Sequence, residues 1–120
     1  MSQRLRRKYQ GQRHQRSSAY AQGFTIIGVV LGLFLAHGVQ IFLYAVTYMA
    51  IGAIDGWEPA LYFSASTFTT VGFGDLVLDK NWRLFSAIES ANGFLLIGWS
   101  TAFLVTVTAR IIRFAEELED

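Results

Sequence analysis

The chain has 120 residues, of which 52% are hydrophobic and 16% are charged, and it contains no cysteine. That length allows one domain at most, and the lack of cysteine excludes a disulfide framework, a thiolate metal site and a redox motif. The net charge of +1 averages over two polar ends, because six of the ten basic residues precede residue 17 and four of the nine acidic residues occupy the last five positions. The stretch between these ends is too apolar for the polar exterior that a small soluble enzyme needs.

Two long segments are apolar enough to cross a membrane. Residues 24–54 contain no Asp, Glu, Lys or Arg, and Glu89 is the only such residue in 84–109. A helix of about 20 apolar residues spans a bilayer core of about 30 Å, and the first segment is much longer than the apolar part of a cleaved signal peptide. We therefore predict two spanning helices, an outer one over 24–54 and an inner one over 84–113.

The basic residues predict the orientation of these helices. A basic tail, residues 1–23, precedes the first helix, and Arg110 and Arg113 follow in the second. The positive-inside rule places both on the cytoplasmic side of the plasma membrane, with residues 55–83 outside and an acidic end, 114–120, inside. The basic tail is expected either to lie on anionic membrane lipids or to stay solvated, and nucleic-acid binding is not expected of it.

A short apolar segment lies between the two spans. Pro59 is typical of a first helical turn, and residues 59–68 continue without a helix breaker. Ten helical residues reach roughly 15 Å, which is about half of the bilayer core. This length predicts a re-entrant helix that enters the membrane and turns back, and such backbone must be buried in protein or line a water-filled path.

The half-helix runs directly into the heptapeptide Thr69-Thr70-Val71-Gly72-Phe73-Gly74-Asp75. This motif resembles the selectivity filter of the potassium channel pore family, bacterial two-transmembrane type, and the resemblance covers roughly residues 24–110. It implies an all-α membrane protein with two transmembrane helices, a pore helix and a filter loop over 70–74. It also implies a homotetramer with three identical partner subunits, about 54 kDa for four chains of 13.4 kDa, that conducts K⁺ passively without a cofactor and is not an enzyme.

The chemistry of such a filter explains its residue types. A potassium ion leaves water only where rings of backbone carbonyls from four subunits replace its hydration shell. Gly72 and Gly74 can adopt positive φ without a Cβ clash, which turns successive carbonyls toward one axis. By the resemblance, K⁺ binds along Thr70, Val71, Gly72 and Phe73; the Thr70 hydroxyl adds an oxygen at the cytoplasmic end, and the side chains of Val71 and Phe73 point away from the axis.

Several residues are expected to support the filter. In the family an aromatic pair packs around the filter, and Tyr62 and Phe63 match its positions. Ser66 stands where some bacterial relatives carry a glutamate that couples to the aspartate after the filter, here Asp75, so this coupling is expected to be absent or different. Thr69 and Glu89 are also expected to support the filter.

The inner helix carries further candidate residues, each with two open interpretations. Gly93 and Gly98 match glycines that bend during gating, although glycines in membrane helices also permit close packing. A stripe at helical spacing either lines a cavity below the filter or packs against other helices: Phe94, Thr101, Val105 and Thr108. Glu89 lies within the span, where it either buttresses the filter or makes a structural polar contact.

Polar residues within the first span have two interpretations as well. His37 and Gln40 lie in the middle of the span, where a pH-sensing histidine and a hydrogen bond between packed helices are both consistent with the sequence, and the latter is preferred. Two other functions remain open for the whole chain. They are a less selective monovalent cation channel of the same fold and a non-conducting membrane adaptor subunit.

Overall fold

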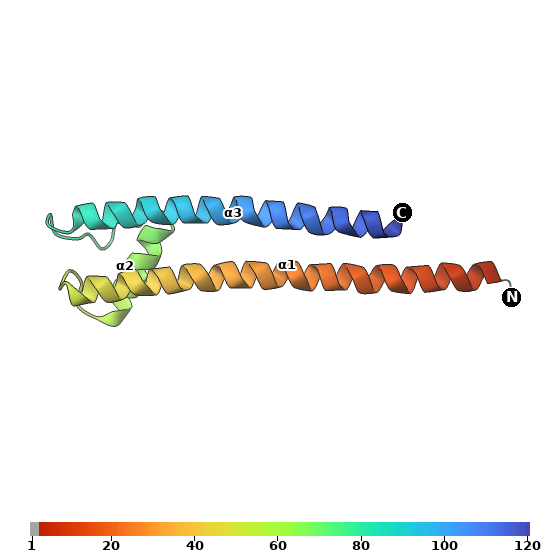
Figure 1. The fold of residues 1–120 in the computed structure, drawn as a ribbon. Coiled ribbons are helices and arrows are strands. Elements are labelled where there is room, and N and C mark those ends of the chain that lie inside the picture. Colours follow the sequence, from red (N-terminus) through yellow and green to blue (C-terminus); the bar gives the residue numbers. More distant parts are fainter. Residues whose placement is uncertain (1–2) are drawn as a thin grey trace. The chain divides into compact units, whose positions relative to one another are not determined.

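The structure, a computed structural model, describes the backbone of residues 3–120 and the side chains of residues 11–13, 16–118 and 120. The chain forms three helices, α1 (Gln3–Ala50), α2 (Trp57–Phe68) and α3 (Arg83–Glu119), shown in Figure 1. Two long apolar helices thus flank a short one, which confirms the predicted all-α fold. The chain divides into two units, one of residues 33–102 and one of residues 1–32 with 103–120.

Helix α1 ends at Ala50, four residues before the end of the charge-free segment that predicted it. Gly52 has a φ of 72° and terminates the helix: its N–H donates to the Met49 carbonyl at 3.2 Å, and the Ala53 N–H donates to the Tyr48 carbonyl at 2.9 Å. These two bonds form a Schellman motif, in which a left-handed glycine satisfies the last helical carbonyls. The hydropathy of the sequence does not indicate this turn, because the residues around Gly52 are as apolar as those of the helix.

Both long helices extend further toward the chain ends than the predicted spans. Helix α1 already begins at Gln3, within the segment predicted as a separate basic tail, and α3 continues past residue 113 to Glu119. Residues 1 and 2 of the predicted tail lie outside the described residues. Arg, Lys, Gln, Glu, Ala and Leu dominate these ends and have high helix propensity, so the helices continue beyond the apolar stretches.

Helix α2 begins at Trp57, two residues before the predicted start. Gly56 occupies the N-cap position with a φ of 100°, and Pro59 is the third helical residue, where the missing N–H leaves no helical bond unmade. Glu58 lies in the first turn, where its negative charge favours the positive end of the helix dipole. In Figure 1, α2 lies across the ends of α1 and α3 that belong to the same unit.

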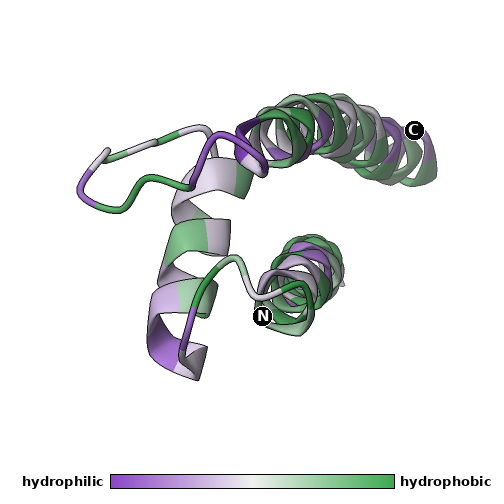
Figure 2. Ribbon diagram, turned by 90° about the vertical axis from the view of Figure 1, so that its left-hand side faces the viewer, coloured by the Kyte–Doolittle hydropathy of each residue, from purple (hydrophilic) through white to green (hydrophobic). Residues whose placement is uncertain are grey.

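Aromatic side chains form the core of the unit of residues 33–102. Tyr48 of α1 is fully buried and contacts Phe63 of α2 and Phe85 of α3, at ring-centroid distances of 5.2 and 5.4 Å. Leu78, from the segment that follows α2, joins this core. Figure 2 shows that segment looping out beside α2 before it enters α3. The loop is therefore anchored at Leu78 while its preceding part stays on the surface.

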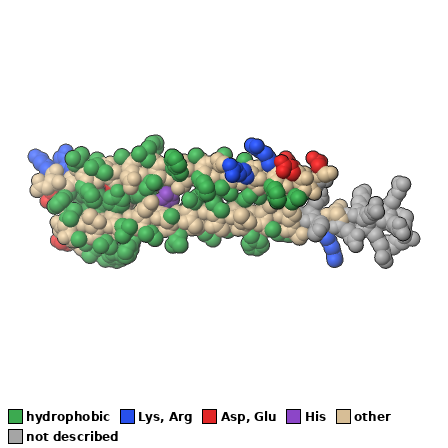
Figure 3. Space-filling view, viewed as in Figure 1, with side chains coloured by type: hydrophobic (Ala, Val, Ile, Leu, Met, Phe, Trp, Pro, Cys, Tyr) green, Lys and Arg blue, Asp and Glu red, His purple; other side chains and the backbone are tan. Residues whose placement is uncertain are grey.

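The two long helices carry candidate membrane spans over Gly11–Ala50 and Arg83–Leu118. Their most apolar windows are not buried within the single chain, as the exposed Phe34, Leu95 and Trp99 illustrate. Figure 3 shows apolar side chains along α3 between charged groups near its two ends. An apolar surface of this kind suits lipid or a neighbouring subunit rather than water.

Candidate functional site

The backbone after α2 alternates in handedness. Positive φ occurs at every second residue, with 63° at Thr70, 56° at Gly72 and 78° at Gly74. The left-handed conformation expected for both glycines is present, whereas that of Thr70, a residue with a Cβ, was not expected from the sequence. Alternating left- and right-handed residues turn successive N–H groups to one side and successive carbonyls to the other.

Hydrogen bonds to α2 show toward which side the N–H groups of this backbone point. The Gly72 N–H donates to the Ser66 carbonyl at 3.0 Å, and the Phe73 N–H donates to the Ser66 hydroxyl at 3.3 Å. In a planar trans peptide the carbonyl points opposite to the N–H. The carbonyls of Val71 and Gly72 therefore point away from α2, and residues 69–75 are all exposed on the single chain.

Tyr62 binds the C-terminal end of the exposed segment, residues 69–75. Its hydroxyl donates to Asp75 Oδ2 at 3.0 Å, and its ring stacks on Phe73 at a centroid distance of 6.2 Å. This bond raises the pKa of Tyr62 above its usual value. Tyr62 thus binds the Asp75 carboxylate while Ser66 binds backbone, and the absent or different coupling expected from the resemblance stays a prediction.

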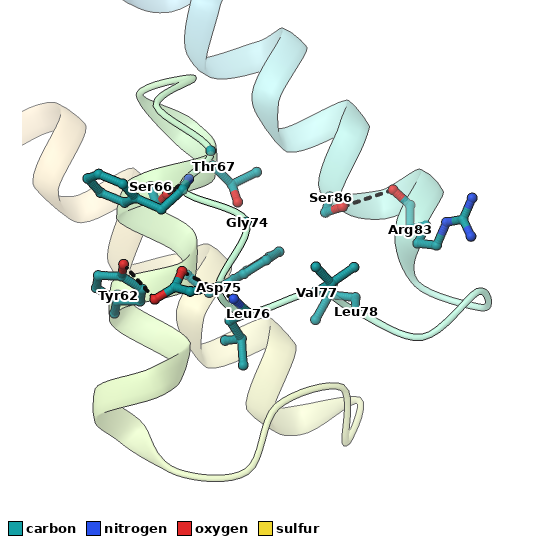
Figure 4. Close-up of a pocket in the computed structure, with 13 residues that line it drawn as sticks. Tyr62, Ser66, Thr67, Gly74, Asp75, Leu76, Val77, Leu78, Arg83 and Ser86 are labelled. Atoms are coloured by element: carbon teal, nitrogen blue, oxygen red, sulfur yellow. Dashed lines mark hydrogen bonds between the residues drawn. The ribbon is translucent and has the colours of Figure 1, made fainter.

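A hollow of about 200 Å³ separates this part of the segment from the start of α3. Figure 4 shows Tyr62 and Asp75 hydrogen-bonded to each other on one side of it, with Ser66 on α2 behind the loop and Ser86 and Arg83 on α3 opposite. The loop therefore rests on α2 along one side and does not pack tightly against α3 there.

Contact between α2 and α3 shows how deep α2 reaches. A Cβ at Gly93 would lie 1.9 Å from the Phe68 carbonyl oxygen, so the last residue of α2 lies against the backbone of α3 at this glycine. Gly93 lies ten residues into α3, or about 15 Å along it, which is half of a bilayer core of about 30 Å. If α3 enters the membrane at Arg83, the C-terminal end of α2 reaches the depth expected of a re-entrant helix, and that placement stays a prediction.

Thr69 closes that end of α2. Its N–H and its hydroxyl both donate to the Ala65 carbonyl, at 3.2 and 2.7 Å. The carbonyl end of a helix carries partial negative charge, which favours a cation beyond it. The exposed segment that begins at Thr70 starts from this end.

Phe63 and Glu89 were both expected to support the exposed segment. The Phe63 side chain and the Glu89 carboxyl group instead make their contacts with the core, away from residues 69–75. Phe63 packs against Tyr48 in the core, one helical position away from the Tyr62 side chain that contacts Phe73. Glu89 is fully buried and forms hydrogen bonds with the hydroxyls of Tyr48 and Ser64. The sequence did not indicate Tyr48 or Ser64 as partners, since hydroxyls in apolar helices have many possible roles.

The family model Ion_trans_2, described as "Ion channel", matches residues 29–110. The chain belongs to this ion channel family. Membership in a channel family also confirms that the chain is not an enzyme, and with its two candidate spans the channel is a membrane protein.

A curated relative is similar over a shorter stretch of the channel. It is the "Uncharacterized membrane protein YdjJ" of Bacillus subtilis (strain 168), 36% identical over 56 residues. The aligned stretch is 46% of this chain and 16% of the relative, so the channel spans only about one sixth of the relative's length. No solved structure matches the channel significantly.

The two glycines of the channel's inner helix differ in their surroundings. Gly93 is in close contact with Phe68, whereas a Cβ at Gly98 would meet nothing within 4 Å. Close packing therefore explains Gly93 without a hinge, and a hinge role for either glycine stays a prediction.

The predicted cavity residues share no contact that would identify a cavity. Phe94, Thr101 and Val105 are exposed, Thr108 is half-buried, and the Thr101 hydroxyl donates to the Ile97 carbonyl of its own helix at 2.8 Å. Their exposure is compatible with lining a water-filled space in an assembly, and that role also stays a prediction.

His37 connects the outer and inner helices of the channel. Its Nδ1 lies 3.0 Å from Gln40 Oε1 and its Nε2 lies 3.0 Å from Ser100 Oγ. Both ring nitrogens thus have partners, in agreement with the helix-packing interpretation of this residue. Asn92 makes a second connection, its amide donating to the Tyr44 hydroxyl at 3.1 Å.

Proposed function

We propose that the chain is the pore subunit of a potassium-selective channel that conducts K⁺ passively as a homotetramer. The observation that carries this proposal is the Thr70–Gly74 backbone, in which positive φ alternates and carbonyls turn away from α2. Stacked carbonyl rings of this kind replace the hydration shell of K⁺. By its resemblance to the potassium channel filter, the segment Thr-Val-Gly-Phe-Gly supports potassium as the ion.

Four subunits are needed because one chain offers one carbonyl at each level of the filter, and an ion must be surrounded. The side chains of Val71 and Phe73 are 55% and 68% exposed in the single chain. Neighbouring subunits would cover these apolar groups around the filter, while the carbonyls face the shared axis. With its basic tail and with Arg110 and Arg113 on the cytoplasmic side, the channel would lie in the plasma membrane with Asp75 at the outer end of the filter.

Ion flux into liposomes tests this function. The purified chain is reconstituted into vesicles, and rubidium uptake and the reversal potential are measured with potassium and sodium gradients. We expect rubidium uptake, little sodium uptake and a reversal potential that follows the potassium gradient. A reversal potential insensitive to potassium contradicts the proposal; equal sodium flux favours the less selective channel, and absence of both flux and tetramer favours the adaptor.

Paired glycine substitutions connect this flux to the filter. Gly72→Ala places a Cβ on a residue with a φ of 56°, where side chains are strained, whereas Gly38 lies in α1 with open space around it. We expect Gly72→Ala to abolish selective flux and Gly38→Ala to leave it unchanged. Selective flux that survives Gly72→Ala would mean that the ion path lies elsewhere.

A further inference from the structure

A cluster of three buried polar side chains connects all three helices away from the filter. Tyr48 of α1, Ser64 of α2 and Glu89 of α3 each have no exposed surface. Glu89 Oε2 accepts from the Tyr48 hydroxyl, and Glu89 Oε1 lies 2.7 Å from the Ser64 hydroxyl oxygen. The Ser64 hydroxyl also lies 2.8 Å from the Ile41 carbonyl of α1.

These contacts need one more hydrogen than the two hydroxyls provide. Three oxygen–oxygen pairs are within hydrogen-bond distance: Tyr48 with Glu89, Glu89 with Ser64, and Ser64 with the Ile41 carbonyl. Each such pair is attractive only with a hydrogen between its oxygens, and each hydroxyl carries a single hydrogen. A carbonyl carries none, so the third hydrogen belongs to the carboxyl group.

We propose that Glu89 is held as a protonated, uncharged acid and that it positions the pore helix. Its Oε1–H donates to Ser64, Ser64 donates to the Ile41 carbonyl, and Tyr48 donates to Oε2. The chain of donors therefore passes from α3 to α2 to α1 and returns to α3. An uncharged carboxyl also avoids most of the cost of placing a charge within a membrane span.

The filter depends on this arrangement through α2, an effect that rests on the proposed channel function. Ser64 and Ser66 are two residues apart on a helix and so lie on nearly opposite faces. Ser64 contacts the cluster, while Ser66 holds the N–H groups of Gly72 and Phe73. Glu89 is thus a positioning residue: it fixes α2 from behind, and α2 fixes the filter backbone in front.

Infrared spectroscopy of the detergent-solubilised full chain tests the proton directly. The protein is labelled with ¹³C at glutamate carboxyl groups in an ester-free detergent, so that Asp and lipid bands do not interfere. At neutral pH we expect the C=O stretch of a protonated glutamic acid in the wild type, its loss in Glu89→Gln and its retention in Glu58→Gln, which alters an exposed glutamate. A carboxylate band lost in Glu89→Gln, with no protonated band in the wild type, overturns the proposal.

Rescue by the neutral isostere tests the positioning role. A glutamine amide can donate to Ser64 and accept from Tyr48, as the protonated acid does, whereas Glu89→Ala leaves two buried hydroxyls without this partner. We expect Glu89→Gln to keep tetramer stability and rubidium flux within about twofold of the wild type and Glu89→Ala to lower them about tenfold or more. A Glu89→Gln protein that fails to fold, or is as impaired as Glu89→Ala, contradicts the proposal.

The two readouts separate this inference from the function proposed above. The infrared band reports the proton whether or not the protein conducts. A protonated Glu89 in a protein without potassium flux would refute the channel function and leave the proton assignment intact. Normal potassium flux with an ionised Glu89 would refute the proton assignment and leave the channel function intact.

Discussion

Ser66 contributes two acceptors to the filter backbone from a single position. Its carbonyl binds the Gly72 N–H and its hydroxyl binds the Phe73 N–H, so two successive peptides are fixed by one residue of α2. Where a glutamate would reach past these peptides to the aspartate, a serine is too short. Its role in this chain is therefore to orient backbone, and Asp75 is bound by another side chain.

Removing the Ser66 hydroxyl should disturb only one of the two peptides. In Ser66→Ala the Gly72 N–H keeps its partner, while the Phe73 N–H loses one, a change of about 1 kcal/mol or roughly fivefold in the stability of the conducting filter. Single-channel recordings should show shorter openings with unchanged assembly. Openings as long as those of the wild type would mean that the Phe73 peptide is held by other contacts.

Tyr62 should act on the same filter from its outer end. Tyr62→Phe keeps the ring that stacks on Phe73 but removes the bond to Asp75, so we expect faster current decay at constant tetramer yield. Tyr20→Phe, at an exposed position of α1, serves as the control. Unchanged decay in both Tyr62→Phe and Asp75→Asn would contradict a role for this pair in filter inactivation.

The same bond predicts a pH dependence. Because the pKa of Tyr62 is raised by its bond to Asp75, the stabilisation is fully present below the ordinary tyrosine pKa of about 10 and is lost as the pH rises through the higher pKa of the folded state. Current decay should therefore be constant around neutral pH and accelerate only in strongly alkaline solution. Tyr62→Phe should lack that alkaline step.

At the scale of elements, the close contact of α2 with α3 depends on one glycine. The Phe68 carbonyl lies where any side chain at position 93 would be, and the neighbouring atoms are backbone that cannot rotate away. A larger residue therefore has to separate the two helices. Since Phe68 immediately precedes Thr69, such a separation would also displace the start of the filter.

Two alanine substitutions distinguish packing from bending in α3. Gly93→Ala should lower the stability of the assembled channel by about 1–3 kcal/mol through overpacking, while Gly98→Ala, with open space around its Cβ, should not lower it. Survival of the tetramer on heating in detergent measures the difference. If both variants are as stable as the wild type and only gating changes, Gly93 acts as a hinge alone.

At the scale of the whole molecule, the exposed apolar surface requires covering. The side chains of Phe94, Leu95 and Trp99 in α3 are 66%, 68% and 79% exposed. Residues 69–75, which precede α3 in the chain, are exposed as well. Lipid can cover apolar side chains, but it cannot satisfy exposed carbonyls within a bilayer. In the proposed tetramer, partner subunits around the filter would satisfy both requirements by enclosing an ion path.

The assembly should contain four chains. Native mass spectrometry in detergent is expected to give a species of about 54 kDa, four times the chain mass of 13.4 kDa, and cross-linking should give a ladder that ends at the tetramer. Gly38→Ala should behave identically, because its site is open. A ladder that ends at two chains would contradict the closed ring that the filter requires.

Sequence reasoning predicted the three helices but not the contacts between them. Uncharged length predicted the two long helices, and the heptapeptide predicted the left-handed glycines. It placed the end of α1 four residues late, because hydropathy does not detect the conformation of Gly52. The partners of Glu89 lie 25 and 41 residues away in the chain, and no local pattern indicates which hydroxyls the folded helices bring to it.

Thr70 places backbone strain at the start of the proposed filter. Its φ of 63° costs about 1–2 kcal/mol in a residue with a Cβ, and in the proposed tetramer this cost would occur once in every subunit of a ring whose aligned carbonyl dipoles repel one another. A cation between those carbonyls offsets both terms, so the permeant ion would behave as a ligand that stabilises the folded assembly. The unfolding temperature of the tetramer should then rise with potassium concentration and not with sodium concentration, and an equal response to both ions would show that the strained backbone is held by protein contacts alone.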